Sequence, residues 1–165
     1  MRIAATAAIL AAAALPGCTD PSAQPAAGGP VRVTRVVDGD TIRVQLAGGE
    51  EAVRYIGVDT PESVKPGAPV ECFAKRASAL NTRLVEGERV RLVNDVEARD
   101  RYGRRLAYVY RARDGLFVNA ELVRRGHATP LTIAPNVRHA ARFEVLAARA
   151  RLSGRGLWSR CGGAP

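Results

Sequence analysis

The chain has 165 residues and a formal net charge of +9, with 25 basic residues against 16 acidic ones. This length argues against several domains, and the basic excess favours a polyanionic partner, either nucleic acid or anionic lipid. Only Lys65 and Lys75 are lysines; the other basic residues are arginines, whose planar guanidinium can make two parallel hydrogen bonds to a phosphate. A compositional bias toward arginine would give the same count, so the charge alone does not fix the partner.

The first 30 residues lack the pattern of a folded domain. Residues 3–15 form an alanine-rich apolar run, which is too short to span a bilayer and typical of a signal-peptide core. The run leads into Leu-Pro-Gly-Cys, which resembles a bacterial lipobox with cleavage before Cys18 and acylation of its sulfur. We therefore expect a signal peptide at 1–17 and a flexible tether at 18–30.

This leader predicts an exported protein. If Cys18 is lipidated, the protein is a cell-envelope lipoprotein held to a membrane by that anchor. The alternative is ordinary secretion after cleavage at a different position.

Residues 31–161 are expected to form the domain, followed by a tail at 162–165. Alternating apolar residues predict strands, and apolar residues three or four apart predict helices. In chain order, the expected elements are strands at 31–37, 41–46 and 51–58, a helix at 71–86, strands at 89–96 and 104–110, and helices at 120–125 and from 136 onward. Five short antiparallel strands with a helix between the third and fourth favour an α+β, mainly β fold, a five-stranded OB-fold barrel with three helices.

The helices carry more detailed expectations. In the first helix, one face is apolar and Asn81 belongs to the polar side. Asn119 and Asn136 are expected to cap the second and third helices. The apolar face of the third helix is expected to consist of Val137, Ala140, Ala141, Val145 and Ala148.

Cys72 and Cys161 remain in the exported chain. Two cysteines in an exported protein are more often paired than free, so we expect a disulfide between the start of the first helix and the tail. His127 and His139 have no metal-ligand spacing with them, which argues against a zinc cluster.

Two acidic motifs stand at the ends of predicted strands. Asp38-Gly39 is a common hairpin turn, and Pro61 fixes a second turn, so turn formation explains much of both motifs. It leaves Asp40 unexplained, because neighbouring carboxylates repel unless they share positive charge. Asp40 and Asp59 both fall at strand ends, where a barrel can bring them together, and a hard cation such as Ca²⁺ would offset their repulsion.

The remaining charged residues of these motifs suit phosphodiester hydrolysis. Glu62 is an acid without a ligand role, and a carboxylate beside a metal-bound phosphate can deprotonate a water. Arg54 and Arg104 can match the charge that develops on the phosphate oxygens. Each arginine taken singly could equally be a solvated surface residue.

Several stretches, taken together, resemble the staphylococcal nuclease, or thermonuclease, family. They are VDGDT at 37–41, RYIGVDTPE at 54–62 and DRYGRRLAY at 100–108, with further similarity at 118–119, 122–124, 126 and 156–158. The resemblance covers nearly the whole domain, and several motifs in order are more specific than any one of them.

The resemblance implies an OB-fold endonuclease that cleaves DNA and RNA with Ca²⁺ and leaves 3′-phosphate ends. By motif, Asp40 and Asp59 would bind Ca²⁺ through carboxylates and Thr60 through its backbone carbonyl. Glu62 matches the general base proposed for the family. By the same matching, Arg54 and Arg104 hold the scissile phosphate, Arg101 a terminal phosphate, and Tyr102 lies beside the nucleotide. We expect a monomer.

The sequence departs from the family at Leu131 and Ile133, where the resemblance leads one to expect tyrosines near the base. Because stacking on an aromatic ring contributes about 1–3 kcal/mol per base, nucleotide affinity is expected to differ. Two other functions remain open. The protein could be a non-catalytic OB-fold module that binds nucleic acid, or an envelope protein whose basic surface binds anionic lipid.

Overall fold

The computed structural model describes residues 29–63, 67 and 69–161. The predicted signal peptide, Cys18, most of the tether and the tail at 162–165 lie outside the described residues.

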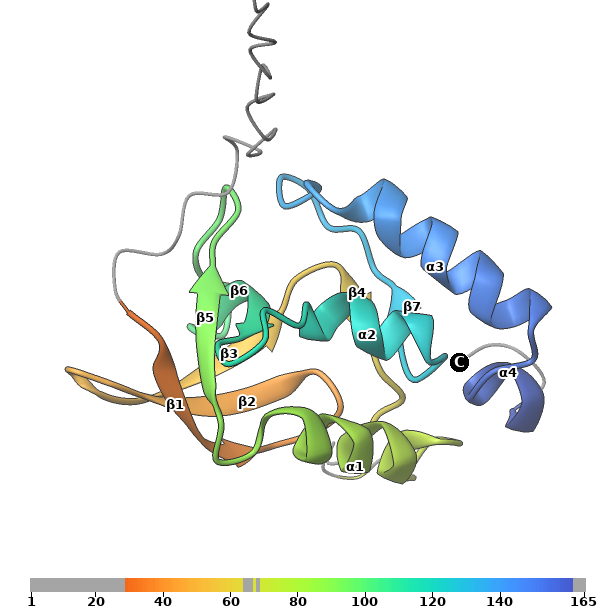
Figure 1. Cartoon of the computed structure of the whole chain (residues 1–165), viewed down its shortest axis with the longest axis horizontal. Helices are drawn as coiled ribbons and strands as arrows, with labels where there is room; N and C mark the ends of the chain where they lie inside the picture. The colour runs from red at the N-terminus through yellow and green to blue at the C-terminus, as the bar shows by residue number, and fades with distance from the viewer. Residues whose placement is uncertain (1–28, 64–66, 68, 162–165) are drawn as a thin grey trace, which may run out of the picture.

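Five strands close into a barrel with the order β1-β2-β3-β6-β5 (Figure 1). The strands are β1 (Val31–Val36), β2 (Thr41–Leu46), β3 (Gly49–Tyr55), β5 (Arg89–Val93) and β6 (Arg105–Arg111). All neighbours are antiparallel except β3 and β6, which run parallel. Branched apolar side chains that alternate along the strands fill the interior, among them the fully buried Val33, Ile42, Val44 and Val53. The predicted OB-fold barrel is confirmed, but the expectation that all its strands are antiparallel is wrong for the pair β3 and β6.

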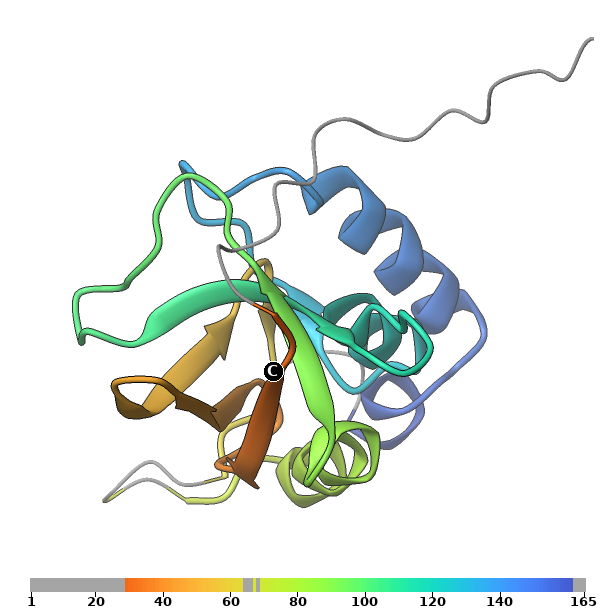
Figure 2. The same cartoon turned by 60° about the vertical axis from the view of Figure 1, so that its left-hand side comes forward.

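The helices lie to one side of the barrel, on the right in Figures 1 and 2. They are α1 (Ala74–Val85), α2 (Val118–Arg124), α3 (Ala140–Leu152) and the single turn α4 (Leu157–Arg160). The central helix α2 packs against both α1 and α3. Among the described residues, none of these helices has the length and apolar character needed to cross a membrane.

The predicted third strand, 51–58, is wrong at its end. β3 stops at Tyr55, and after a turn the chain continues as β4 (Val58–Asp59), which pairs with β7 (Thr129–Pro130) outside the barrel. The turn is possible because Gly57 adopts a φ of 78°, and a Cβ there would lie 2.5 Å from the ring of Phe143. The break separates Asp59 from the barrel wall.

The two expected asparagine caps are also wrong. Asn119 lies inside α2, where its Oδ1 accepts the N–H of Val109 and its Nδ2 donates to the carbonyl of Ile56, both at 2.9 Å. Asn136 precedes α3 by several residues and pairs with both backbone groups of Glu97 at 2.8 and 3.1 Å. Both amides bond backbone groups of distant segments instead of capping a helix end.

The predicted buried face of α3 is wrong as well. The residues that face the core are Phe143, Ala147 and Ala150, whereas Val145 is half exposed. The helix begins at Ala140, later than expected, and the ring of Phe143 sets which side turns inward.

Helix α1 buries Ala77, Leu80 and Leu84 as predicted, but Asn81 is fully buried instead of solvent-facing. Its Oδ1 accepts the hydroxyl of Tyr55 at 2.9 Å and its Nδ2 donates to the carbonyl of Asp38 at 3.0 Å. Asn81 therefore links α1 to the loop between β1 and β2.

Cys72 and Cys161 are joined by a disulfide, with their Cα atoms 6.0 Å apart. The bond connects the residues just before α1 to the end of α4, across 89 positions of sequence.

Candidate active site

The strand register brings the three charged motifs to one end of the barrel. Thr41 at the start of β2 lies opposite Arg54 near the end of β3, and Arg54 lies opposite Leu106 near the start of β6. Asp40 and Arg104 immediately precede β2 and β6, so residues far apart in sequence gather beside Arg54.

The Arg54 guanidinium joins the two predicted metal ligands. Its Nε lies 3.1 Å from Oδ1 of Asp40, and its Nη2 lies 2.7 Å from Oδ1 of Asp59. Its Nη1 donates to the carbonyls of Tyr55 and Val58 at 3.0 and 2.7 Å. The turn after β3 thus fixes the orientation of the guanidinium between the two carboxylates.

Asp40 is a buried carboxylate with directional partners. It is 5% exposed, and its Oδ2 accepts both the backbone N–H and the hydroxyl of Thr60, at 2.8 and 2.9 Å. Its own N–H donates to Oδ1 of Asp38 at 3.0 Å. These bonds hold the Asp38 loop against the Thr60 turn.

Negative charge is crowded in this region. Burial raises the pKa of Asp40, although Arg54 acts in the opposite direction. Burial and the Asp40 carboxylate raise the pKa of Asp38 to about 6. The pKa of Asp59 is raised by burial against the lowering effect of Arg54, with Glu71 and Glu62 adding repulsion. One guanidinium does not neutralise these acids, so a cation is electrostatically favoured here.

A cavity of about 60 Å³ lies between these groups. It is lined by Asp38, Asp40, Thr41, Arg54, Asp59, Thr60, Pro61, Glu62 and Arg104. The donors are oxygens, with no histidine or cysteine in the lining, so the residues fit a hard cation such as Ca²⁺. Across the described ranges, no three acidic, histidine or cysteine side chains are placed to enclose an ion. A cation held by Asp40 and Asp59 would therefore need the Thr60 carbonyl, water or substrate oxygens as well.

Glu62 reaches this cavity from the turn after β4. Its N–H donates to Oε2 of Glu71 at 2.8 Å, and its carbonyl accepts the N–H of Glu71 at 3.0 Å. This reciprocal pair fixes the Glu62 backbone to the segment that leads into α1.

The loop before β6 is organised by Asp100, a residue for which the sequence had suggested no role. Its Oδ2 accepts from Nε of Arg104 at 2.7 Å, and its Oδ1 accepts the N–H groups of Tyr102 and Arg104 at 2.9 and 3.0 Å. Tyr102 is 68% exposed, with the guanidinium of Arg101 4.8 Å from its ring centroid. An aspartate four residues before Arg104 was the sequence signal for this arrangement.

A larger groove of about 770 Å³ adjoins the cavity. Arg54 and Arg104 line both the cavity and the groove, so the two arginines stand at the junction. Tyr102, Leu131 and Ile133 are among the residues along the groove, and the last two are partly exposed. The structure therefore brings every sequence-predicted residue of the site to the cavity or to this groove.

Replacement of Gly39 by alanine is expected to disturb this site without altering its charges. A Cβ on Gly39 would lie 2.5 Å from Oγ1 of Thr60, so Thr60 must move away from Asp40. We expect a loss of stability of about 1–3 kcal/mol in urea denaturation. Gly48→Ala is the matched control, since nothing lies within 4 Å of a Cβ there. Equal stability of the two variants would contradict the contact.

The chain is thus an OB-fold barrel protein that gathers acids and arginines around one cavity, beside an open groove. Residues 52–160 match the family described as staphylococcal nuclease homologue, and the chain belongs to this family.

Two relatives carry the name thermonuclease. That of Staphylococcus hyicus is 40% identical over 128 residues, which cover 78% of this chain and 75% of the relative. That of Staphylococcus intermedius is 41% identical over the same shares of the two chains. Endonuclease YncB of Bacillus subtilis is 37% identical over 134 residues, which cover 80% of this chain but 63% of that protein.

Proposed function

We propose that this protein is a Ca²⁺-dependent endonuclease that hydrolyses phosphodiester bonds of DNA and RNA and leaves 3′-phosphate ends. The observation that carries the proposal is the convergence of Asp40, Asp59, Arg54, Glu62 and Arg104 on one cavity. Family membership supports nuclease chemistry, and the names of the relatives support nucleic acid as the substrate.

Arg54 and Arg104 differ in how many of their guanidinium nitrogens are already hydrogen-bonded. Arg54 already uses Nε, Nη1 and Nη2 in bonds to Asp40, Asp59 and backbone carbonyls, so it is a rigid, nearly saturated cation. Arg104 is held at Nε by Asp100, while its two Nη atoms have no acceptor within the described part of the chain. Arg104 is therefore the side chain that can offer a guanidinium fork to two phosphate oxygens.

In the proposed reaction, Glu62 takes a proton from a water beside the phosphorus, and the water oxygen attacks. The bond from phosphorus to the 5′-oxygen breaks, the phosphate remains on the 3′-oxygen, and the leaving 5′-oxygen takes up a proton. Arg54 and Arg104 stabilise the negative charge on the non-bridging oxygens. Bound Ca²⁺ would supply charge neutralisation and polarise the phosphate and water.

The groove is the proposed path for the nucleotide next to the scissile phosphate. Arg101 and Tyr102 stand on its rim, where they can contact a terminal phosphate and a base. Leu131 and Ile133 offer apolar contact without aromatic faces, so we expect weaker stacking and a weaker preference among bases.

We further propose that the protein acts outside the cytoplasm. A disulfide between Cys72 and Cys161 supports this location, since such bonds persist mainly in oxidising compartments. Lipidation of Cys18 and a monomeric state stay predictions, and mass determination of the protein extracted from membranes tests the first.

The function is tested by digestion of single- and double-stranded DNA and RNA with Ca²⁺, Mg²⁺ or a chelator. We expect cleavage with Ca²⁺, none with the chelator, and products that phosphatase treatment shows to carry 3′-phosphates. Retention of DNA on a filter without cleavage at millimolar Ca²⁺ would instead support a non-catalytic binding module.

A further inference from the structure

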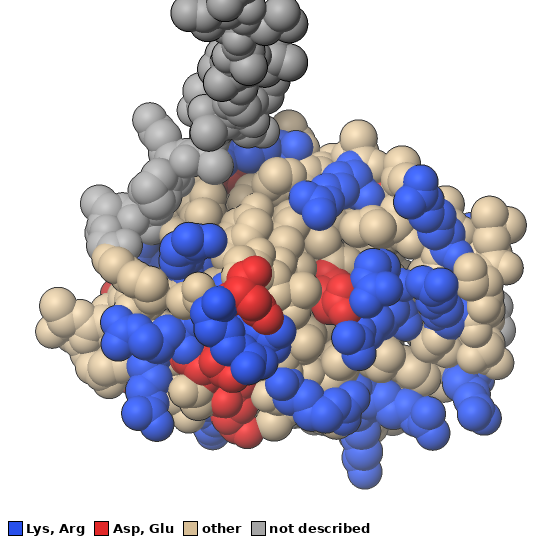
Figure 3. Space-filling model, in the orientation of Figure 1, with Lys and Arg blue, Asp and Glu red and all other residues tan. Residues whose placement is uncertain are grey.

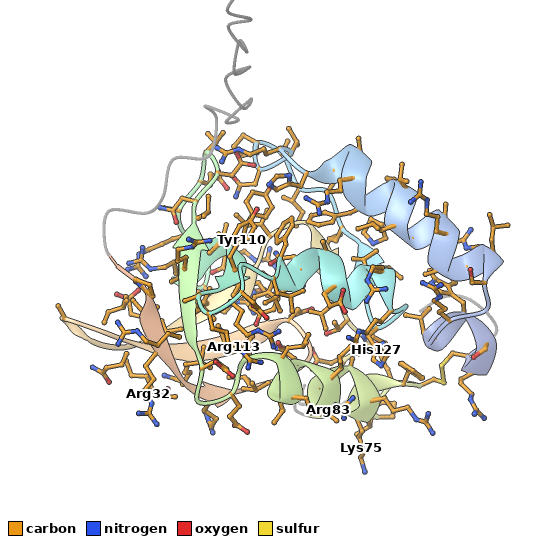
Figure 4. The ribbon with its side chains drawn as sticks, in the orientation of Figure 1. Arg32, Lys75, Arg83, Tyr110, Arg113 and His127 are labelled. Carbon is orange, nitrogen blue, oxygen red and sulfur yellow. A yellow bond between two sulfur atoms is a disulfide. The ribbon has the colours of Figure 1, made fainter. Side chains whose placement is uncertain are left out.

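A second basic cavity lies away from the active site, beside α1 and α4. It has a volume of about 420 Å³ and is lined by Arg76 and Arg83 of α1, by His127, and by Arg160 of α4. No carboxylate is among its lining residues. Figure 3 shows basic side chains along the lower right edge of the molecule, over α1, and Figure 4 shows Arg83 and Lys75 on that helix with His127 nearby.

The positive charge of this cavity is not balanced locally. Some exposed arginines elsewhere are paired with an acid, as Arg43 is with Glu50 at 3.2 Å. Within the described part of the chain, Arg76, Arg83 and Arg160 form no ion pair. Arg76 and Arg83 are separated by seven residues, or two helical turns, so both point from the same face of α1 about 10 Å apart. Uncompensated like charges on one face are stabilised by an anionic ligand.

Covalent and steric constraints hold the walls of the cavity together. The Cys72–Cys161 disulfide fixes α4, and therefore Arg160, beside the start of α1. The backbones of Gly126 and Gly156 touch so closely that a Cβ on Gly156 would lie 2.1 Å from the carbonyl oxygen of Gly126. The cavity is therefore organised before any ligand arrives.

The electrostatics of His127 agree with a positive cavity. Its ring packs edge-on against Phe73 with centroids 4.9 Å apart. The pKa of His127 is lowered, first by burial, and in addition by the positive charges of Arg125, Arg83 and Arg76. Protonation of the ring is thus opposed by the same charges that would attract an anion.

A neighbouring hollow relates the basic cavity to the active-site turn. The hollow, of about 290 Å³, is lined by Arg76 and Arg160 and also by Glu71. Glu71 is the residue that holds the backbone of Glu62 through two hydrogen bonds. A polyanion that passes from the catalytic cavity around the start of α1 reaches the cluster of arginines next.

We propose that Arg76, Arg83 and Arg160 form an accessory site for the phosphate backbone of a polynucleotide, several nucleotides from the bond that is cleaved. The identity of the polyanion rests on the proposed nuclease function, whereas the cavity and its charge do not. The site increases affinity for long strands over short ones, because a dinucleotide in the catalytic cavity does not reach it. Phosphate contacts of this kind carry no base preference.

The test compares the full chain carrying R76Q/R83Q with wild type and with R32Q/R149Q. The control removes the same charge from exposed positions on β1 and α3, and Figure 4 shows Arg32 far from His127. Kd for a long single-stranded DNA is measured in chelator, so that binding is separated from cleavage. Loss of two phosphate contacts should lower the slope of log Kd against log salt by about 1.4. Between about 50 and 200 mM salt, the wild type should therefore lose about sevenfold more affinity for DNA than R76Q/R83Q does.

Cleavage of a dinucleotide with Ca²⁺ is expected to be the same in all three proteins. If R76Q/R83Q binds long DNA as the control does, the accessory site is refuted, even where the enzyme cleaves normally. If no protein cleaves but R76Q/R83Q alone loses DNA affinity, the nuclease proposal fails and the accessory site stands. Binding to vesicles of anionic phospholipid is measured in parallel. If R76Q/R83Q binds these vesicles more weakly but keeps its DNA affinity, the cavity binds lipid and the proposal is overturned.

Discussion

Replacement of Glu62 by glutamine is expected to lower kcat on DNA by about 10²- to 10⁴-fold, the usual contribution of a positioned general base. Glutamine keeps the size of the side chain and its polar end but cannot accept a proton at neutral pH. The backbone bonds between residues 62 and 71 do not depend on that side chain, so the turn should keep its place. KM is expected to change little, since the proposed phosphate contacts come from Arg54 and Arg104.

The measurement is steady-state kinetics at saturating Ca²⁺, with Ca²⁺ affinity determined separately by calorimetry. The calorimetric value should stay near that of wild type if Asp40 and Asp59 provide the protein carboxylates. Glu144→Gln, which removes one exposed charge from α3, is the control and should leave kcat unchanged. A kcat for Glu62→Gln within about twofold of wild type would remove Glu62 from the role of base.

The positions of the site residues could be predicted from sequence because they sit at strand ends. Asp40 precedes β2 and Arg104 precedes β6, and closing a five-stranded barrel necessarily brings these ends toward β3. What the sequence could not provide was the pair of contacts that Arg54 makes with Asp40 and Asp59. The contact with Asp59 depends on the turn at Gly57. That turn needs a glycine, because a Cβ at residue 57 would clash with the ring of Phe143, which is distant in sequence.

The errors at three asparagines have a common physical origin. Asn81, Asn119 and Asn136 look like surface or cap residues because asparagine is polar and favours helix ends. In the folded chain, each side chain bonds groups of a distant segment, and burial follows from those bonds. Local pattern cannot distinguish a cap from a tertiary bridge, because both use the same amide.

The accessory basic site also could not be predicted from the sequence. Arg76 and Arg83 could be placed on one helix face from their spacing, but Arg160 comes from the far end of the chain. The disulfide, the close approach of Gly126 to Gly156 and the buried Leu157 bring it there. A charge cluster of this kind therefore becomes visible only when tertiary structure is known.

Removal of the disulfide is expected to lower the free energy of unfolding by about 4 to 5 kcal/mol. The bond closes a loop of 89 residues, and in the chain-entropy model its loss returns that much conformational freedom to the unfolded chain. The variant is Cys72→Ser with Cys161→Ser, since a single replacement would leave a reactive thiol. Urea denaturation of the double variant and of wild type measures the difference.

Wild type in excess reductant is the internal control and should match the double variant, because both lack the same constraint on the unfolded chain. The native contacts of α4 remain, since Leu157 is 1% exposed and its carbonyl accepts the N–H of residue 161. A loss of less than about 1 kcal/mol would contradict the expectation, since it would show an unfolded chain that stays compact without the bond.

Because Arg160 is then held beside Arg76 only by non-covalent contacts, the double variant should also bind long DNA with a weaker salt dependence than oxidised wild type.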